Sequence, residues 1–402
     1  MNSLIKTKED FIRYISRTST IPTGIDGPTP YVLIESMFEK LTTNVDWKNP
    51  NLKILDPAFG FGSFLFFSYL KLKEYHSDKH ILNNMLYGVE IEPFRFELVK
   101  RKFNIKNIFK EDFLNPSNKL NKILNMKFDV IIGNPPYQLK VGPGKTEPIW
   151  HKFVENAFKY LNTDGYLSFI HPTGWRSPVG KFKATQNLLK SKKIITLSVN
   201  DFNEGNRIFG VGTAFDWYVI KNSSEKCLTS VIDSNKITSM VDLLNWEYIP
   251  NAEFDKFKSL IASEDDEKIK VLYSRSTYGT DKKNIAFEKD DSFRHSCVYT
   301  ITKKDGINLV YSNVKTKDHF GIPKVIWTNG LGTYPIVDTK GKYGLTQFAY
   351  AIEDDIQNLE NIKTALNSEE FLNLMKYIKF TNNKYDYKVI STFRKDFWKQ
   401  FI

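Results

Sequence analysis

The chain is 402 residues long, with 41% hydrophobic, 14% aromatic and 26% charged residues, a composition typical of a folded globular protein. Its 57 Lys and Arg exceed its 46 Asp and Glu, which gives a formal net charge of +11 and favours a polyanionic partner. No apolar run approaches the roughly 20 residues that span a bilayer, and the first residues do not resemble a signal peptide. Two cysteines are too few for a disulfide framework. We therefore expect a cytoplasmic protein without a membrane partner.

The first half of the chain alternates predicted strands with predicted helices. Short apolar runs predict strands over 52–58, 84–91, 128–134, 165–172, 193–200 and 213–221. Helical patterns lie between them, including 30–41, 93–103 and 149–161. This order predicts an α/β fold, a doubly wound and mostly parallel sheet, over residues 1–221.

The pattern changes after a polar stretch at 222–226, which we interpret as a linker. Residues 321–352 are predicted to be strand-rich, with a turn at Asn329–Gly330, and residues 353–378 have helical character. We therefore predict a second domain of mixed α+β structure over 222–402.

Acidic residues follow the first three predicted strands. Asp56 begins the stretch DPAFGFGSF, whose glycines let the backbone approach a ligand closely, although its spacing is not that of a phosphate loop. Glu90 ends the second strand, where a carboxylate suits the hydroxyls of a ribose. Asp112 falls near the third strand end and could accept from an exocyclic amine. Each position has a structural alternative, a tight turn or a surface carboxylate, but the three together indicate an adenosine-containing ligand.

The most specific feature of the sequence is IIGNPPY, residues 131–137. Pro135 and Pro136 directly follow a buried strand, make the backbone rigid and leave nearby carbonyls free to accept hydrogen bonds. Asn134 adds a second acceptor and Tyr137 adds a flat aromatic face. Two acceptors converging on a planar amine over an aromatic ring would hold an exocyclic NH2 for attack. The structural alternative is a rigid turn at a strand end.

With these motifs, the chain resembles the gamma class of S-adenosylmethionine-dependent adenine-N6 DNA methyltransferases, the TaqI-type enzymes of restriction–modification systems. The resemblance covers roughly residues 20–221 by motif and the remainder by position. It implies a catalytic, S-adenosylmethionine-binding domain of the methyltransferase fold at 1–221 and a target-recognition domain at 222–402. The implied activity is methyl transfer to the N6 amine of an adenine flipped out of double-stranded DNA. The implied partners are duplex DNA and a cognate restriction endonuclease, and a monomer is compatible with these roles.

The resemblance also implies roles for single residues. Asn134 and the carbonyl of Pro135 would accept from the target amine, with Pro136 completing the rigid loop and Tyr137 stacking on the flipped base. Phe209 matches the family's later aromatic that contacts this base, and its alternative is a place in the core. The implied cofactor-binding residues are Thr29, Pro30, Asp56, Ala58, Gly60, Gly62, Glu90, Asp112 and Asn134.

The positive charge is concentrated in one quarter of the chain. Residues 101–200 hold 17 Lys and Arg against 6 Asp and Glu, which equals the whole surplus. Clustered bases bind phosphates by releasing counterions, so we expect them to surround the NPPY loop and contact DNA. A solvated lysine surface is the alternative. The expected DNA-binding residues are Lys181, Lys183, Lys192 and Lys193. Candidates for reading bases in the second domain are Arg275, Trp327, Asn329 and Tyr334, and for each of these four a structural role is the favoured alternative.

Other functions remain open from the sequence. NPPY also occurs in methyltransferases that act on RNA or on a glutamine of release factors, and those are often shorter. Cytosine-N4 methyltransferases more often have Ser at the first motif position. A fusion with a nuclease would need a further domain for which neither end of the sequence offers a pattern, and an inactive DNA-binding module is disfavoured by the intact motifs. The six histidines lack ligand spacing, so no metal is predicted.

Overall fold

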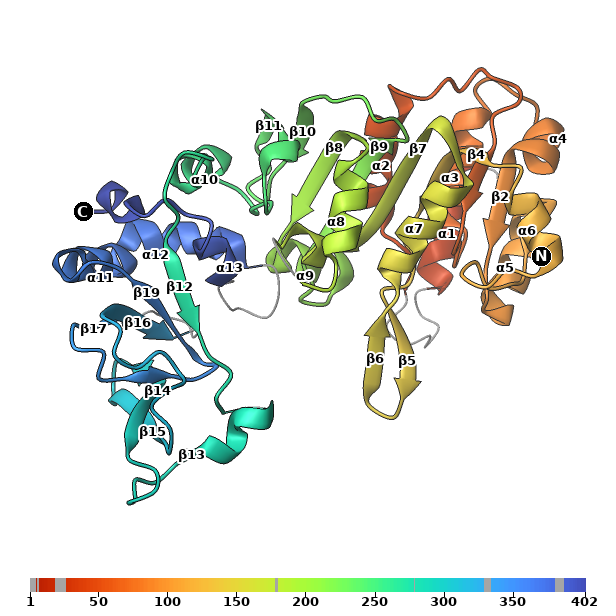
Figure 1. Cartoon of the computed structure of the whole chain (residues 1–402). Coiled ribbons are helices and arrows are strands. Elements are labelled where there is room, and N and C mark those ends of the chain that lie inside the picture. The colour runs from red at the N-terminus through yellow and green to blue at the C-terminus, as the bar shows by residue number, and fades with distance from the viewer. Residues whose placement is uncertain are drawn as a thin grey trace. The chain divides into compact units, whose positions relative to one another are not determined.

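The structure is a computed structural model that describes residues 5, 7–18, 27–177, 180–277, 279–328, 334–379 and 387–402. It divides into two compact units (Figure 1). Unit 1 comprises Met1–Trp175 and Lys181–Trp246, and unit 2 comprises Arg176–Gly180 and Glu247–Ile402.

Unit 1 is an α/β unit built on one large sheet. Its helices are α1 (Lys8–Thr18), α2 (Tyr31–Thr42), α3 (Ser63–Leu72), α4 (Asp78–His80), α5 (Pro93–Phe103), α6 (Asn118–Leu124), α7 (Trp150–Tyr160), α8 (Lys183–Lys190) and α9 (Phe202–Phe209). Its strands are β1 (Ile54–Asp56), β2 (Leu86–Val89), β3 (Asn107–Phe109), β4 (Phe128–Gly133), β5 (Gln138–Gly142), β6 (Lys145–Pro148), β7 (Leu161–Pro172), β8 (Lys193–Asn200), β9 (Phe215–Lys221), β10 (Thr229–Ile232) and β11 (Thr238–Val241).

The strand order confirms the predicted fold class. Among the described residues the sheet runs β11-β10-β8-β9-β7-β4-β1-β2-β3, while β5 and β6 form a separate hairpin. β9 is antiparallel to its neighbours β7 and β8, and β11 is antiparallel to β10, whereas the other neighbouring strands are parallel. This is the mostly parallel, doubly wound sheet that the sequence predicts.

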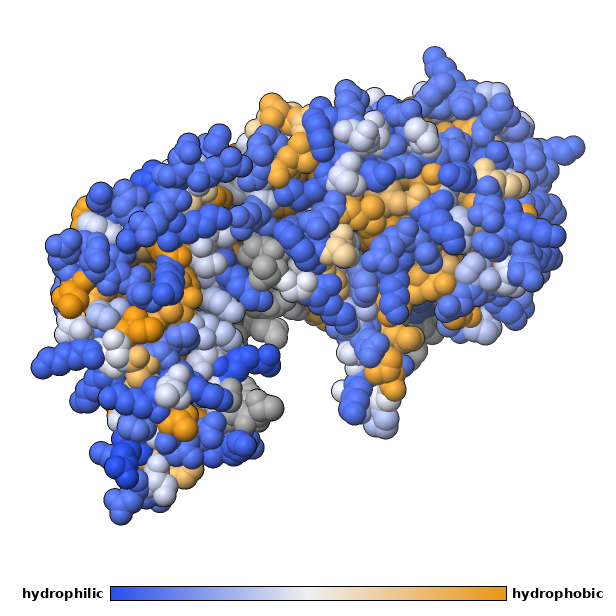
Figure 2. All heavy atoms as spheres, in the orientation of Figure 1, coloured by the Kyte–Doolittle hydropathy of each residue, from blue (hydrophilic) through white to orange (hydrophobic). Residues whose placement is uncertain are grey.

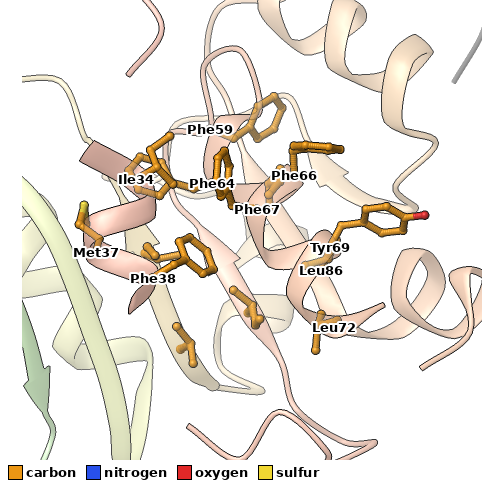
Figure 3. Close-up of a cluster of buried hydrophobic side chains, with 14 of the residues drawn as sticks. Ile34, Met37, Phe38, Phe59, Phe64, Phe66, Phe67, Tyr69, Leu72 and Leu86 are labelled. Carbon is orange, nitrogen blue, oxygen red and sulfur yellow. The ribbon is translucent and has the colours of Figure 1, made fainter. Parts of the chain in front are cut away.

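The central strands are apolar on both faces because the sheet is buried on both sides. Ile54, Val130 and Ile132 belong to an apolar cluster with residues of α2 and α3, many of them phenylalanines (Figure 3). The neighbouring Leu55 and Ile131 are equally buried and alternate to the other face. The core therefore holds the ends of β1, β2 and β4 in fixed relative positions.

The expected domain boundary at 221/222 is wrong, since unit 1 continues to Trp246. After the polar stretch, β10 pairs in parallel with β8 and adds to the edge of the large sheet. β11 then pairs with β10 as an antiparallel hairpin. Residues 222–226 are thus a connection within unit 1.

Unit 2 has the predicted mixed α+β structure. Its strands are β12 (Lys270–Tyr273), β13 (Ile285–Ala286), β14 (His295–Thr302), β15 (Gly306–Ser312), β16 (Lys324–Thr328), β17 (Ile336–Asp338), β18 (Gly344–Leu345) and β19 (Ala349–Glu353). They form the sheets β12-β19-β16-β17 and β13-β15-β14-β18. Its helices are α10 (Phe254–Leu260), α11 (Leu359–Asn367), α12 (Glu369–Met375) and α13 (Tyr387–Ile390).

Of the candidate base-reading residues of unit 2, Trp327 has the structural role that was its alternative. It lies in β16 and is only 2% exposed, so it is a core residue. Arg275 and Tyr334 are exposed, as a contact with DNA requires. Asn329, with its predicted turn, lies outside the described residues.

Candidate functional site

The carboxyl ends of β1, β2 and β4 meet at one edge of the sheet and bring the sequence motifs together. Asp56 is the last residue of β1 and pairs with Gly88 of β2, while Leu55 pairs with Ile131 of β4. Glu90 directly follows β2, and Asn134 directly follows β4. Ligands of doubly wound sheets bind at this edge, so its position alone makes it the candidate site.

Asp56 is a buried carboxylate with one uncommitted oxygen. Its Oδ1 accepts a hydrogen bond from the backbone N–H of Ala58 at 3.1 Å. Within the described residues, its Oδ2 is buried and has no hydrogen-bond partner. Burial raises the pKa of this carboxyl well above its ordinary value, and the nearby charge of Glu90 adds to the rise. A buried acceptor of this kind is costly unless a ligand satisfies it.

The NPPY loop lies directly against Asp56. A Cβ added to Gly133 would come within 2.9 Å of Asp56 Oδ1, a distance that side chains do not adopt. Gly133 is therefore required by the close packing of β4 against the end of β1. The candidate cofactor carboxylate and the NPPY loop consequently belong to one site.

Glu90 ties the glycine turn after β1 to the end of β2. Its Oε2 accepts from the N–H of Gly60 at 2.8 Å, and its Oε1 accepts from the N–H of Glu92 at 2.8 Å. Gly60 and Gly62 have φ of 54° and 81°, values that favour glycine, and Gly62 is the cap before α3. Burial raises the pKa of Glu90, while its two backbone hydrogen bonds oppose the rise. The turn and the carboxylate thus form one pre-shaped edge of the site.

Asp112 follows β3 at the same edge of the sheet, one strand beyond Glu90. It is half-buried. Its Oδ1 accepts from the N–H of Leu114 at 2.8 Å, and its Oδ2 accepts from Asn115 Nδ2 at 2.8 Å. These bonds hold Asp112 in a local turn, and each carboxylate oxygen keeps capacity for a further donor.

The amide of Asn134 is oriented by a distant residue. Its Nδ2 donates to Thr29 Oγ1 at 3.2 Å, across 105 positions of sequence. Its Oδ1 is buried and, among the residues described, has no hydrogen-bond partner. Thr29 precedes Pro30, the cap of α2, so the start of this helix is positioned beside the loop. Asn134 Oδ1 is therefore a buried acceptor, and the hydrogen bond from Nδ2 to Thr29 sets the direction in which it points.

The rest of the NPPY loop is held at its base. Pro135 is buried and Pro136 is exposed. The carbonyl of Tyr137 accepts from the N–H of Ile149 at 3.0 Å, which closes the chain after the β5–β6 hairpin. The Tyr137 hydroxyl is buried, and burial raises the pKa of this phenol.

Phe209 is the last residue of α9 and lies at the same edge of the sheet. Its ring contacts Phe215 edge to face, with centroids 5.0 Å apart. Phe215 pairs with Pro172 at the end of β7 and with Asn200 at the end of β8. Phe209 is half-buried and packs against the core, as its alternative expected, and its contact with a flipped base stays a prediction.

The four lysines expected around the loop are divided between the two ends of the strands, the end that carries the NPPY loop and the opposite end. Lys183 begins α8, and Lys181, which is exposed, lies near His151 at the start of α7. Lys193 begins β8 at the edge opposite to Asn200, with Lys192 directly before it.

Local contacts support this division. Lys193 pairs with Glu225 at 2.8 Å, and Lys192 lies over the ring of Phe158 at 5.5 Å. The expectation that all four lysines flank the NPPY loop is therefore wrong for Lys192 and Lys193. Lys181 and Lys183 keep their position on the loop's side of the sheet.

Sequence reasoning missed a buried polar cluster at the ends of β7 and β9. The His171 ring stacks on Trp150 at 4.3 Å and contacts the Tyr218 hydroxyl at 3.2 Å. Trp175 Nε1 donates to Asp216 Oδ2 at 2.8 Å. The available signal was Asp216, a carboxylate inside an otherwise apolar predicted strand. The described residues include no group of three or more His, Cys, Asp and Glu arranged to hold a metal ion.

Comparison with known proteins finds a family model that matches the central segment. A family model described as the Eco57I restriction-modification methylase matches residues 74–209, which include Glu90, Asp112, the NPPY loop and Phe209. An uncharacterized adenine-specific methylase of Mycoplasma pneumoniae is 24% identical over 347 residues, covering 60% of this chain and 82% of that protein. The resemblance to restriction–modification methylases is thereby confirmed.

Solved structures share the fold. The type IIL restriction-modification enzyme MmeI, solved in complex with DNA, matches 96% of this chain and 67% of its own, with a TM-score of 0.52 and 12% identity. The DrdV–DNA complex matches 87% of this chain and 52% of its own, with a TM-score of 0.53 and 11% identity. The chain spans about half the length of the type I modification subunits that it also matches. No helix in the described part of the chain has the length and apolar character needed to cross a membrane.

Proposed function

We propose that this protein is a site-specific DNA methyltransferase that transfers the methyl group of S-adenosylmethionine to the N6 amine of an adenine flipped out of duplex DNA. The observation that carries the proposal is the amide of Asn134. Its Oδ1 is a buried acceptor without a partner in the described residues, and its Nδ2 is held by Thr29. A fixed acceptor beside two prolines suits a planar amine that must donate a proton.

The proposed chemistry depends on the geometry of that amine. The lone pair of an aromatic amine is delocalised into the ring, which makes the nitrogen a poor nucleophile. Hydrogen bonds to Asn134 Oδ1 and to the carbonyl of Pro135 favour a pyramidal nitrogen with its lone pair directed at the methyl donor. Tyr137 supports the base from its flat face. Positioning and electrostatics then provide most of the rate, because no covalent enzyme intermediate is needed.

The residues at the ends of β1 and β2 fit the cofactor. S-adenosylmethionine, when bound, supplies an activated methyl group on a sulfonium. The buried Asp56 Oδ2 lacks a partner among the described residues and suits a donor on the methionine moiety. Glu90, already held by Gly60, suits the ribose hydroxyls, and Asp112 suits the adenine amine. Gly60 and Gly62 give the turn proposed to face this moiety a left-handed backbone that other residues adopt only with strain.

We assign target recognition to unit 2, with double-stranded DNA as the partner. MmeI and DrdV were solved with DNA, and each shares its fold with this chain over both units. A restriction endonuclease acting on the same DNA sequence is the expected companion, as the restriction–modification family suggests. The cytoplasm, where DNA is accessible, is the expected location.

The proposal is tested by the variant Asn134→Ala with duplex plasmid DNA and labelled S-adenosylmethionine. Loss of the amide removes the acceptor, so we expect methyl incorporation to fall at least about a hundredfold at saturating cofactor. Calorimetry measures cofactor affinity separately, because Asn134 is also among the implied cofactor-binding residues. Asn51→Ala is the matched control, because Asn51 is exposed before β1, at the opposite end of that strand.

Methyl incorporation by Asn134→Ala at a rate near that of the wild type would remove the proposed mechanism. Base-modification sequencing of the product separates N6-methyladenine from N4-methylcytosine and reports the recognised sequence. Strand cleavage without methylation would favour a nuclease instead.

A further inference from the structure

The NPPY loop continues directly into a hairpin that stands apart from the sheet. β5 begins at Gln138, the residue after Tyr137, and β6 ends at Pro148, just before α7 (Figure 1). In the described residues β5 and β6 pair only with each other. Their base is closed by the bond between the Ile149 N–H and the Tyr137 carbonyl. The hairpin is therefore attached at both ends to the loop proposed to hold the target base.

The hairpin exposes apolar side chains to solvent. Leu139 is 52% exposed and Val141 is 49% exposed. Val141 is the extra residue of a bulge, a device that redirects a side chain. The projecting hairpin shows hydrophobic spheres beside hydrophilic ones (Figure 2). An isolated two-stranded hairpin is marginally stable in water, and exposed apolar residues add nothing to its folding.

The charges of the hairpin indicate what covers this apolar pair. Lys140 lies between Leu139 and Val141, and Lys145 faces Gly142 beside the bulge. The exposed Glu147 pairs with Leu139 across the hairpin, so the three charged residues sum to +1. Both lysines are exposed. Apolar side chains beside lysines suit a nucleic acid, in which stacked nucleobases lie between phosphates. A protein partner would explain the apolar pair but not its attachment to the catalytic loop.

We infer that the β5–β6 hairpin is a DNA wedge, which inserts Leu139 and Val141 into the duplex beside the target base while Lys140 and Lys145 contact phosphates. This inference rests on the proposed function. The wedge occupies the space left in the base stack and so offsets the free energy lost when the base is extruded. Because the hairpin is joined to Tyr137, its insertion also brings the base-binding loop to the extruded base.

The test is the double variant Leu139→Ser/Val141→Ser on two synthetic duplexes of the recognised sequence. In one duplex the target adenine is paired, and in the other it lies opposite an abasic site, so that extrusion is already favoured. We expect transfer to the paired duplex to fall about tenfold or more, and transfer to the abasic duplex to stay within about twofold of the wild type. The matched control is Ile237→Ser/Met240→Ser, an apolar pair that is 60% and 61% exposed at the β10–β11 hairpin.

Two results would overturn the wedge. One is unchanged transfer to the paired duplex, and the other is an equal loss on both duplexes, which would indicate general damage to the site. Wild-type protein that methylates neither duplex contradicts the proposed function itself and the wedge with it. Thermal melting of the double variant should match that of the wild type, because both side chains are exposed.

Discussion

Thr29 is the residue on which the direction of the Asn134 amide depends. Its hydroxyl oxygen accepts from Asn134 Nδ2, and this bond leaves Oδ1 to face the position proposed for the target amine. Without the acceptor, the amide is free to turn and to present its NH2 group, which would repel the amine protons. The role of Thr29 is therefore one of positioning, exerted through Asn134.

We predict that Thr29→Val lowers the rate constant for methyl transfer roughly five- to tenfold, since valine keeps the shape of threonine but lacks the acceptor. Thr29→Ser keeps the hydroxyl and should stay near the wild-type rate. Single-turnover kinetics with saturating cofactor measure this step, and calorimetry measures cofactor affinity separately, because Thr29 is also among the implied cofactor-binding residues. Equal losses in the two variants would mean that Thr29 acts by packing alone.

The sequence predicts some of these residues better than others. Asp56, Glu90 and Asn134 could be placed at one edge because carboxyl ends of parallel strands share an edge. The Thr29–Asn134 hydrogen bond could not be predicted, since it joins positions 105 residues apart whose side chains meet only in the folded unit. The clash that requires Gly133 likewise depends on the exact register of β4 against β1.

At the level of elements, α9 presents Phe209 and is held by an ion cluster. Glu204 accepts from Arg207 Nε at 2.7 Å and from Lys236 Nζ at 2.9 Å. The hydrogen bond from Arg207, followed by that from Lys236, lowers the pKa of Glu204 to about 2 from its ordinary 4.5. Because the folded state favours the ionised form, this cluster stabilises the protein fully above about pH 4.5 and loses its effect as the pH falls toward 2.

We predict that Glu204→Gln flattens the acid limb of the stability profile. The wild type should lose about 1 kcal/mol more than the variant between pH 5 and pH 2, a value reduced for solvent screening of a partly exposed group. The free energy of unfolding in urea, measured at several pH values, gives the comparison. Parallel profiles for the two proteins would contradict a role for this cluster in holding α9.

Element boundaries could be predicted where local chemistry marks them. The helix expected at 93–103 is observed as Pro93–Phe103, because Glu92 caps its first turn and Asn104 adopts the left-handed conformation that ends it. The boundary expected at 221 failed because β10 is only four residues long and owes its place to pairing with β8. No local pattern in 222–232 distinguishes a further strand of the sheet from a linker.

At the scale of the whole molecule, the positively charged residues of 101–200 lie at both ends of the strands of the large sheet. Each helix and strand of a doubly wound unit crosses the full depth of the sheet, so neighbouring segments alternate between its two edges. α8 carries the chain from Lys183 to the edge where β8 begins with Lys193. A run of bases that is continuous in sequence is therefore divided in space, which sequence counting cannot reveal.

This division predicts unequal effects on DNA binding. Lys181→Gln/Lys183→Gln removes two bases on the side of the NPPY loop, so we expect weaker binding to all duplexes and a salt dependence shallower by about 2 in the log–log slope. Lys192→Gln/Lys193→Gln is the control at the opposite edge, where Lys193 already pairs with Glu225, and its slope should equal that of the wild type. Fluorescence anisotropy with a labelled duplex across a salt series measures both. If the second pair changes the slope as much as the first, DNA contacts both ends of the strands. That result would contradict the prediction that phosphates are bound mainly on the side of the NPPY loop.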